Sequence, residues 1–245
     1  MPDDLARAFA FMVGGEMAGT RTEVSSFGVA VRSDEVPLRQ DSNYLLVERT
    51  EASGKALAAE VDRLGLRTLL VLDEPTGVRL ETDFERLDWK KHRGVVMAHR
   101  RAADRRADTG LVVEVDEARL RPLRRRAILA APWGSPELAE QLLDAKLLTA
   151  SRVDTRFLAV LVDDEVVACA DLYEKGSIAQ IEDLQTVEEH RGRGYASALV
   201  LHALAAAVER GAGLVFLVTN TDDGPVSLYS SLGFEPIGHY FKFFR

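Results

Sequence analysis

The sequence predicts an α/β protein in which strands and helices alternate along the chain. Extended apolar segments such as Ile178–Val187 and Leu214–Val218 flank an alanine- and leucine-rich helical stretch, Tyr195–Arg210. Alternation of this kind is typical of a sheet covered by helices. The chain has 245 residues, of which 47% are hydrophobic. It is therefore long enough for one large domain or two small ones with a buried core.

Local signals set the order of elements in the second half of the chain. Ser135, Pro136 and Glu137 supply a helix cap, a proline at the first helical position and an acidic first turn, so a helix should follow as far as Leu148. Asp163-Asp164 marks a turn between two strands. The predicted order is strand 111–115, helix 120–129, helix 135–148, strands 157–162, 166–173 and 178–187, helix 195–210, strand 214–218, short helix 226–232 and strand 240–244.

The segment Arg191–Ala196 has the composition of an anion-binding loop. It joins an extended apolar run to an alanine-rich helix, a junction where backbone N–H groups gather at the positive end of the helix dipole. Gly192 and Gly194 allow positive φ and a close approach to a ligand, and Arg191 and Arg193 add positive charge. The loop predicts a phosphate or pyrophosphate ligand, with an ordinary strand-to-helix turn as the alternative.

Two motifs in order carry a family resemblance. Arg191, Gly194 and Ala196 form Arg-x-x-Gly-x-Ala, and Leu228–Phe234 reads Leu-Tyr-Ser-Ser-Leu-Gly-Phe, with a helix and a strand between them. They resemble the pyrophosphate loop and the second signature of the GNAT superfamily of N-acetyltransferases. The resemblance covers residues 111–245. It implies the GNAT fold, a mixed, mostly antiparallel sheet flanked by helices on both faces.

An internal repeat suggests that the chain is a tandem. Residues 55–63 and 202–210 are identical at six of nine positions, at an offset of 147. A second pair of segments is also similar. Phe84-x-x-Leu87-x-Trp89 precedes an apolar strand in the first half, and Tyr229-x-x-Leu232-x-Phe234 precedes one in the second half. Two matches at nearly one offset predict a degenerate second copy of the same α/β unit.

The first copy lacks the phosphate chemistry. Subtracting the offset from the loop leads to Tyr44–Arg49, which has no paired glycines, and carboxylates near the next helix start would repel a pyrophosphate. We expect residues 1–100 to form a degenerate GNAT-like domain without a CoA loop, 101–110 a linker, and 111–245 the catalytic domain that binds acyl-CoA. The first domain packs against the second, forms one wall of its acceptor pocket, or does both.

The resemblance implies acetyl-CoA (coenzyme A) as cofactor. The loop would hold its pyrophosphate, and the end of the preceding strand would pair with the pantetheine arm, where backbone N–H groups could also support an oxyanion. Ser197 would donate a hydrogen bond to a phosphate oxygen or cap its own helix, and Asn220 would steady the pantetheine. The cofactor-binding residues expected are Leu184, Gln185, Thr186, Arg191, Gly192, Arg193, Gly194, Tyr195, Ala196, Ser197 and Asn220.

Catalytic candidates follow from what thioester aminolysis needs. By resemblance, Tyr229 would protonate the departing thiolate, and its alternative role is to pack its ring. Glu182 and Asp183 are adjacent carboxylates that strand alternation would point to opposite faces, and one of them would act as general base. We favour Glu182, with two solvated or satisfied carboxylates as the alternative. Gln180 occupies a site where the family can place a base.

The predicted activity is N-acyl transfer, most simply of an acetyl group from acetyl-CoA, to a primary amine of a small molecule or peptide by direct attack in a ternary complex. The formal charge of −8 mildly favours a cationic acceptor. Trp133 is a candidate acceptor contact, with a core or lid role as the alternative. A different class, an acyl-CoA-binding regulatory module with weak catalysis, and O-acyl transfer on the same scaffold also fit the sequence.

Composition excludes other classes. The negative charge argues against nucleic acid as main partner, and no apolar run reaches the roughly 18–20 residues of a membrane span. Cys169 is the single cysteine and should be buried. Five scattered histidines predict no metal site, and the acidic N-terminus predicts a cytoplasmic protein. The basic run Arg119–Arg126 is a solvated helix face or lies near the CoA 3′-phosphate or an acidic acceptor. The sequence predicts no particular oligomeric state for the protein.

Overall fold

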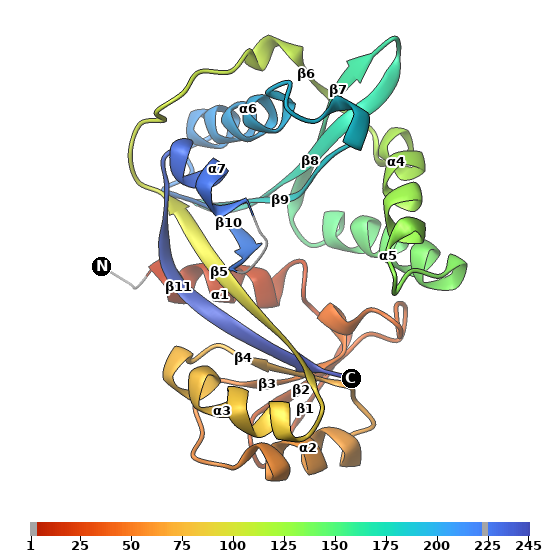
Figure 1. The fold of residues 1–245 in the computed structure, drawn as a ribbon, viewed down its shortest axis with the longest axis vertical. Coiled ribbons are helices and arrows are strands. Elements are labelled where there is room, and N and C mark those ends of the chain that lie inside the picture. The colour runs from red at the N-terminus through yellow and green to blue at the C-terminus, as the bar shows by residue number, and fades with distance from the viewer. Residues whose placement is uncertain (1–3, 222–224) are drawn as a thin grey trace.

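The computed structural model describes residues 4–221 and 225–245, whose strands form one mixed sheet (Figure 1). In order of pairing, the strands are β1-β2-β3-β4-β11-β5-β10-β9-β8-β7-β6. Within the described residues, the β3–β4 and β9–β10 pairs are parallel and the other pairs are antiparallel. The predicted mixed, mostly antiparallel sheet is confirmed.

The strands are β1 (Arg21–Val24), β2 (Val29–Arg32), β3 (Tyr44–Val47), β4 (Thr68–Val71), β5 (Lys90–His99), β6 (Val112–Val115), β7 (Asp154–Val162), β8 (Glu165–Lys175), β9 (Ile178–Thr186), β10 (Leu214–Asn220) and β11 (Phe234–Phe244). The α-helices are α1 (Asp4–Gly14), α2 (Gly54–Arg63), α3 (Glu74–Arg86), α4 (Glu117–Ala130), α5 (Pro136–Ala150), α6 (Tyr195–Glu209) and α7 (Val226–Ser231). Single 3₁₀ turns occur at η1 (Gln40–Ser42), η2 (Thr109–Leu111) and η3 (Glu188–His190).

The elements predicted for the second half are confirmed in type and order. Ser135 caps α5 by accepting a hydrogen bond from the N–H of Leu138 at 3.2 Å, and Asp163 and Asp164 take positive φ in the β7–β8 turn. The last strand is longer than predicted and begins at Phe234. A register shift between Pro236 and Gly238 places two residues typical of turns inside this strand, which explains why its first half was not recognised.

Helices cover both faces of the sheet in the second half of the chain (Figure 1). On one face, the alanine- and leucine-rich side of α6 packs on β7 to β10. On the other face, Leu120 of α4 packs beside Cys169 of β8, which is fully buried as predicted. Phe11 of α1 meets Phe216 of β10 edge-to-face at 5.8 Å between ring centroids. The sheet is therefore buried on both sides around the central strands.

Strand β5 of the first half lies between two strands of the second half. It pairs with β10 from Ala98 to Gly94 and with β11 from His99 to Lys90. Strand β11 in turn pairs with β4. Figure 1 shows β5 and β11 as long neighbouring strands that connect the upper and lower parts of the molecule. The two halves therefore share one hydrogen-bonded sheet.

The order of elements repeats along the chain. β3-α2-β4-α3-β5 in the first half matches β9-α6-β10-α7-β11 in the second, and each set holds one parallel pair. The offset of 147 places β4 on residues 215–218 of β10. This order supports the predicted tandem. The division at residues 1–100, 101–110 and 111–245 stays a prediction; residues 100–108 contain neither helix nor strand.

The sharing of strands generates a stability prediction at Gly77 in α3. An added Cβ would overlap the ring of Phe241 in β11. Gly77→Ala should therefore lower the free energy of unfolding by about 1–3 kcal/mol, although alanine in an open helix normally gains roughly 1 kcal/mol over glycine. Urea denaturation measures the change. Val78→Ala, at a side chain 47% exposed in the same helix, is the control and should have little effect. A more stable Gly77→Ala protein would contradict the packing.

Candidate active site

The central parallel pair of the sheet opens part-way along its length. β9 and β10 pair from Ile178 and Leu214 as far as Ile181 and Leu217, yet β9 continues to Thr186 and β10 to Asn220. No pairing between them follows among the described residues. On its other edge β9 remains paired with β8 as far as Thr186. The predicted pantetheine-binding residues Leu184, Gln185 and Thr186 therefore border a gap between two diverging strands.

The Arg191 loop lies at the end of β9 and forms the start of α6. Gly192 and Gly194 have φ of +75° and +82°, and a Cβ at either would meet open space. Gly194 is the N-cap of α6 and supplies no side-chain cap. No acceptor among the described residues is found for the N–H groups of Tyr195, Ala196 and Ser197. These donors meet the requirements of an anion at a helix N-terminus.

The two loop arginines are exposed. Arg191 Nε lies 3.4 Å from the carbonyl oxygen of Thr186, and Arg193 Nη2 lies 3.3 Å from that of Glu189. The ring of Tyr195 stacks near His190 at 6.4 Å between centroids, and Ser197 is buried. The structure thus brings the predicted loop residues together at the start of α6.

Glu182 and Asp183 lie on one face of the sheet, so the expectation that they point to opposite faces is wrong. Asp183 has φ of +54°, and the β8–β9 register shifts here, between Cys169 and Asp171. This bulge interrupts the alternation of side chains. Glu182 stands opposite Asp171, and Asp183 binds the cations of α4 and α5 on that same side.

The environments of the two carboxylates differ. Burial, with the negative charge of Glu16, raises the pKa of Glu182 to about 8, and Gln180 Nε2 donates to Glu182 Oε2 at 2.9 Å. Burial also opposes the charge of Asp183, but Lys146 and Arg124 outweigh it and hold the pKa of Asp183 below its usual value. Glu182 is therefore suited to gain and lose a proton near neutral pH, whereas Asp183 stays ionised.

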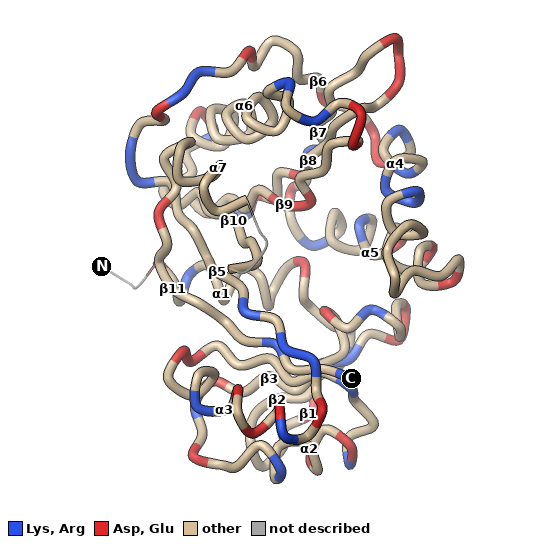
Figure 2. The backbone as a smooth tube through the Cα atoms, in the orientation of Figure 1, with Lys and Arg blue, Asp and Glu red and all other residues tan. Residues whose placement is uncertain are grey.

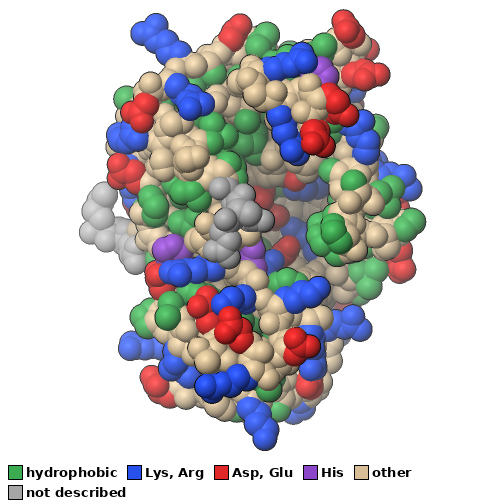
Figure 3. All heavy atoms as spheres, in the orientation of Figure 1, with side chains coloured by type: hydrophobic (Ala, Val, Ile, Leu, Met, Phe, Trp, Pro, Cys, Tyr) green, Lys and Arg blue, Asp and Glu red, His purple; other side chains and the backbone are tan. Residues whose placement is uncertain are grey.

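Glu182 lines a cavity of about 240 Å³ formed by both halves of the chain. Met12, Glu16, Met17, Asp41 and His92 contribute from the first half, and Gln180, Glu182, Val218, Thr219, Asn220, Tyr240 and Lys242 from the second. Sequence reasoning missed the first-half residues, for which no motif gives a signal. Figure 3 shows a hollow near the centre of one face of the molecule, with charged side chains inside it.

Ion pairs balance part of the charge in this cavity. Glu16 lies 2.9 Å from Arg39, and Asp41 is paired with Lys242. Burial opposes ionisation of Asp41, but Lys242 and Arg39 lower its pKa to about 2. Glu182 has no cation within ion-pair distance among the described residues. It is thus the carboxylate of the cavity with the freedom to accept a proton from an amine.

Tyr229 lies on α7 and is 7% exposed. Its ring meets Phe234 at 6.5 Å between centroids. Burial, followed by the charge of Glu182, raises its pKa to about 12, so the phenol keeps its proton at neutral pH. The charge of Glu182 therefore contributes to the environment of Tyr229, which does not itself line the Glu182 cavity.

The remaining candidates are placed separately. Asn220 ends β10 opposite Gly94 and lines the Glu182 cavity. Trp133 lies between α4 and α5, is 62% exposed, and does not line that cavity.

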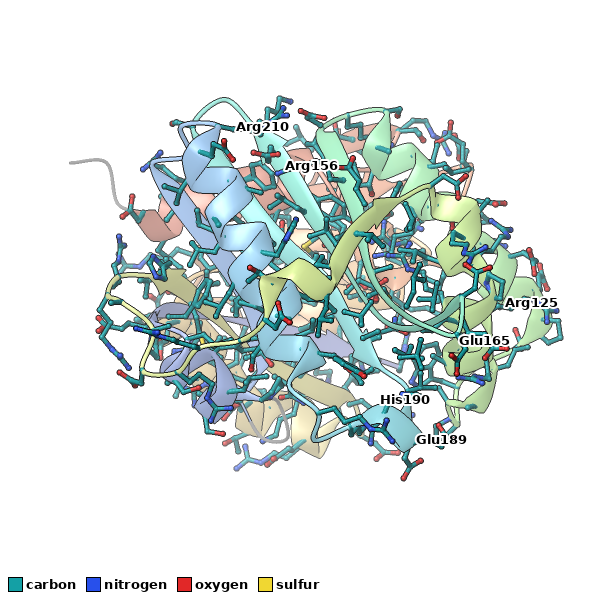
Figure 4. All side chains as sticks on the ribbon, turned by 90° about the horizontal axis from the view of Figure 1, so that it is seen from above. Arg125, Arg156, Glu165, Glu189, His190 and Arg210 are labelled. Carbon is teal, nitrogen blue, oxygen red and sulfur yellow. The ribbon has the colours of Figure 1, made fainter. Side chains whose placement is uncertain are left out.

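Figure 2 shows the basic residues of α4 in blue, and their side chains lie in different environments. Arg121 and Arg125 pair with Glu140 of α5, whereas Arg124 is buried. A groove of about 620 Å³ separates α4 from the segment before the loop. Figure 4 labels Arg125 on α4 and Glu189 and His190 on η3. The arginines are therefore mostly held by carboxylates of this chain.

Comparison with known proteins agrees with this geometry. Residues 115–234 match the Acetyltransferase (GNAT) family, a segment that contains the open strand pair, the Arg191 loop and Tyr229. The chain carries a GNAT acetyltransferase domain. N-acetyltransferase family 8 member 2 of Rattus norvegicus is 43% identical over 63 residues, which cover 25% of this chain and 28% of the rat protein.

Two solved structures share the fold over nearly the whole chain. A GCN5-related N-acetyltransferase from Kribbella flavida has a TM-score of 0.66 at 16% identity, covering 100% of this chain and 96% of that one. A functionally unknown conserved protein from Staphylococcus epidermidis ATCC 12228 has a TM-score of 0.68 at 16% identity, covering 93% of this chain and 94% of that one. At this identity the likeness concerns the fold.

Two kinds of feature are absent from the residues that the structure describes. No group of His, Cys, Asp and Glu side chains has the arrangement of a metal site. No helix is long and apolar enough to span a membrane.

The pKa of Glu182 generates a stability prediction. The pKa of this carboxyl is near 4.5 in the unfolded chain and about 8 in the folded protein. The protonated form therefore stabilises the fold fully below pH 4.5, and this contribution is lost as pH rises through 8. At about 1.4 kcal/mol per pKa unit, the loss is on the order of 5 kcal/mol.

Glu182→Gln should remove this dependence. Its free energy of unfolding, relative to wild type, should increase between pH 5 and pH 8.5 in urea titrations. Glu114→Gln, at an exposed strand position, is the control and should follow wild type. Parallel curves for wild type and Glu182→Gln would contradict the raised pKa.

Proposed function

We propose that this protein transfers an acetyl group from acetyl-CoA to a primary amine by direct attack in a ternary complex. The observation that carries the proposal is the gap between β9 and β10, which ends at a loop with donors that lack acceptors in the described chain. Acetyl-CoA would supply a thioester carbonyl that is reactive toward an amine. The exposed loop arginines and the N–H donors at the start of α6 fit the charge and hydrogen-bonding needs of its pyrophosphate.

The proposed binding roles follow the geometry. The N–H groups of the Arg191 loop and the start of α6 would bind the pyrophosphate, with Arg191 and Arg193 adding charge. The open edge of β9, Leu184 to Thr186, would pair with the pantetheine arm as an added strand, and its N–H groups would stabilise an oxyanion. Holding both substrates in one cleft supplies much of the rate enhancement.

The proposed acceptor site is the cavity around Glu182. Glu182 would take a proton from the attacking amine, directly or through water, and Tyr229 would donate a proton to the departing thiolate. Glu16, Asp41 and Glu182 all line this cavity. Glu16 and Asp41 are already paired with Arg39 and Lys242, so Glu182 is the carboxyl group left to hydrogen-bond the amine. Residues of the first half would thus form one wall of the acceptor pocket while lacking a CoA loop of their own.

Binding of acetyl-CoA is tested by thermal shift with Gly194→Glu. A ligand at about 100 times its Kd stabilises the fold by roughly 2.7 kcal/mol, which wild type should show with acetyl-CoA and with CoA. Gly194→Glu should lose the shift because its carboxylate would occupy the anion site. Gly211→Glu is the matched control, since Gly211 has φ of +87° and open space at the other end of α6.

The outcomes separate the alternatives. A ligand shift in wild type and in Gly211→Glu, but not in Gly194→Glu, supports the cofactor site. No shift in wild type would overturn the proposal. A shift without turnover on a panel of amines would support the acyl-CoA-binding regulatory module instead.

The acid role is tested by Tyr229→Phe, which keeps the ring and removes the proton. Turnover should fall about 100-fold or more, in the range of general-acid catalysis, while the thermal shift with CoA persists. Tyr44→Phe is the control: it removes a buried hydroxyl that donates to the carbonyl of Met17 in the first half, and turnover of its folded form should not change. Full turnover by Tyr229→Phe would refute the assignment.

A further inference from the structure

Four charged side chains, two of them buried and two partly buried, lie beside the β9 bulge. Arg124 of α4 and Lys146 of α5 face Asp171 of β8 and Asp183 of β9. Arg124 Nε is 2.8 Å from Asp183 Oδ2, and Lys146 Nζ is 3.1 Å from Asp171 Oδ2 and 3.3 Å from Asp183 Oδ2. The Arg124 and Asp171 side chains are 2% and 0% exposed. With two positive and two negative groups, the cluster is neutral.

The cluster holds Asp183 by both carboxylate oxygens. Oδ2 faces Arg124 and Lys146, and Oδ1 accepts a hydrogen bond from Gln185 Nε2 at 2.7 Å. The backbone of Asp183 has φ of +54°, a region that non-glycine residues rarely occupy, although Asp and Asn tolerate it best. Ion pairs from two helices thus act on the residue whose unusual backbone forms the bulge.

Asp171 is anchored independently of β9. The hydroxyl of Tyr173 donates to its Oδ2 at 2.7 Å, and the same hydroxyl lies 3.3 Å from Lys146 Nζ. The guanidinium of Arg124 also packs on the ring of Phe157, 5.5 Å from its centroid. The cations are therefore fixed by β7 and β8, so Asp183 meets charges whose positions are already set.

The cluster borders the proposed base. Lys146 and Asp183 act on the charge of Glu182 in opposite directions, and Glu16 adds a third charge. Besides burial, the charge of Glu182 also raises the pKa of Tyr229 of α7 and of Tyr240 of β11. The other charged or titratable groups that line the Glu182 cavity are Asp41, His92 and Lys242.

We propose that Arg124, Lys146 and Asp171 act with Asp183 as positioning residues that hold the β9 bulge and balance the charge next to Glu182. The proposal rests on the proposed role of Glu182 as base. It assigns Asp183 to positioning and removes it from the candidate bases, because its carboxylate is committed to two cations. A buried ion cluster with one partner removed leaves an uncompensated charge, so the cluster should work as a unit.

The test compares Asp183→Asn, Lys146→Met and the double variant. Asparagine tolerates the same backbone and removes one negative charge, whereas methionine removes one positive charge. In protein labelled with ¹³C at glutamate carboxyls, NMR titration follows Glu182 directly, and Glu182→Gln assigns its signal. Asp34→Asn, which breaks an ion pair with Arg21 whose side chains are 60–64% exposed, is the control.

We expect opposite shifts from the single variants. The pKa of Glu182 should fall in Asp183→Asn and rise in Lys146→Met, each by about 1, as for a removed neighbouring charge. The double variant, in which one cation and one anion remain, should return close to wild type. Each single variant should have a lower Tm, and the double variant should recover part of it. Asp34→Asn should leave the Glu182 titration unchanged.

Shifts in the same direction, or none, would overturn the proposal because a purely structural role predicts lower Tm without opposite titration changes. If Asp183→Asn does not fold, the test uses Lys146→Met, and an unchanged or lower pKa of Glu182 in that variant would overturn the proposal. Failure of the double variant to fold better than Asp183→Asn would also overturn it. The NMR readout does not depend on turnover. Full activity of Glu182→Gln alongside the expected shifts would refute the base assignment and leave the cluster in place.

Discussion

Parallel pairing between β9 and β10 stops after Ile181 and Leu217, and the site is built around that point. A strand that diverges from one neighbour must keep the other, or its buried backbone groups lose their partners. β9 does so by pairing with β8 as far as Thr186, across a shift in register. The bulge lets the strand bend while one ladder persists. The other edge is left with donors and acceptors that a ligand can satisfy.

The far edge of β10 is occupied by a strand from the other half of the chain. β5 pairs with β10 through Gly94 opposite Asn220, and with β11 on its other side. This position fixes the first half against the diverging end of β10. It also explains how Glu16 and His92, distant in sequence from the loop, line the cavity of Glu182. The first half therefore shapes the Glu182 cavity, the proposed acceptor site, through strand pairing.

Much of the fold was predictable because its signals are local. The Ser135 cap, the Asp163-Asp164 turn and the glycines of the Arg191 loop each act within a few residues, and the repeat offset indicated a second copy of the α/β unit in the first half. The bulge at Asp183 was not predictable, since an aspartate with positive φ depends on cations of two helices. Arg124 looked like a member of a solvated basic run. Its spacing of four from Leu120 was the available signal that it faces the sheet.

Adjacent carboxylates acquire different chemistry here through their neighbours. Two cations keep Asp183 ionised, whereas Glu182 is buried beside Glu16 without an ion pair of its own among the described residues. Environments that separate the pKa values of neighbouring acids assign one group to proton transfer and the other to a fixed charge. The positive groups lie on α4 and α5, and Glu16 follows α1 in the first half. The protonation of Glu182 is therefore set jointly by both halves, because the shared sheet brings Glu16 and Lys146 to the same carboxylate.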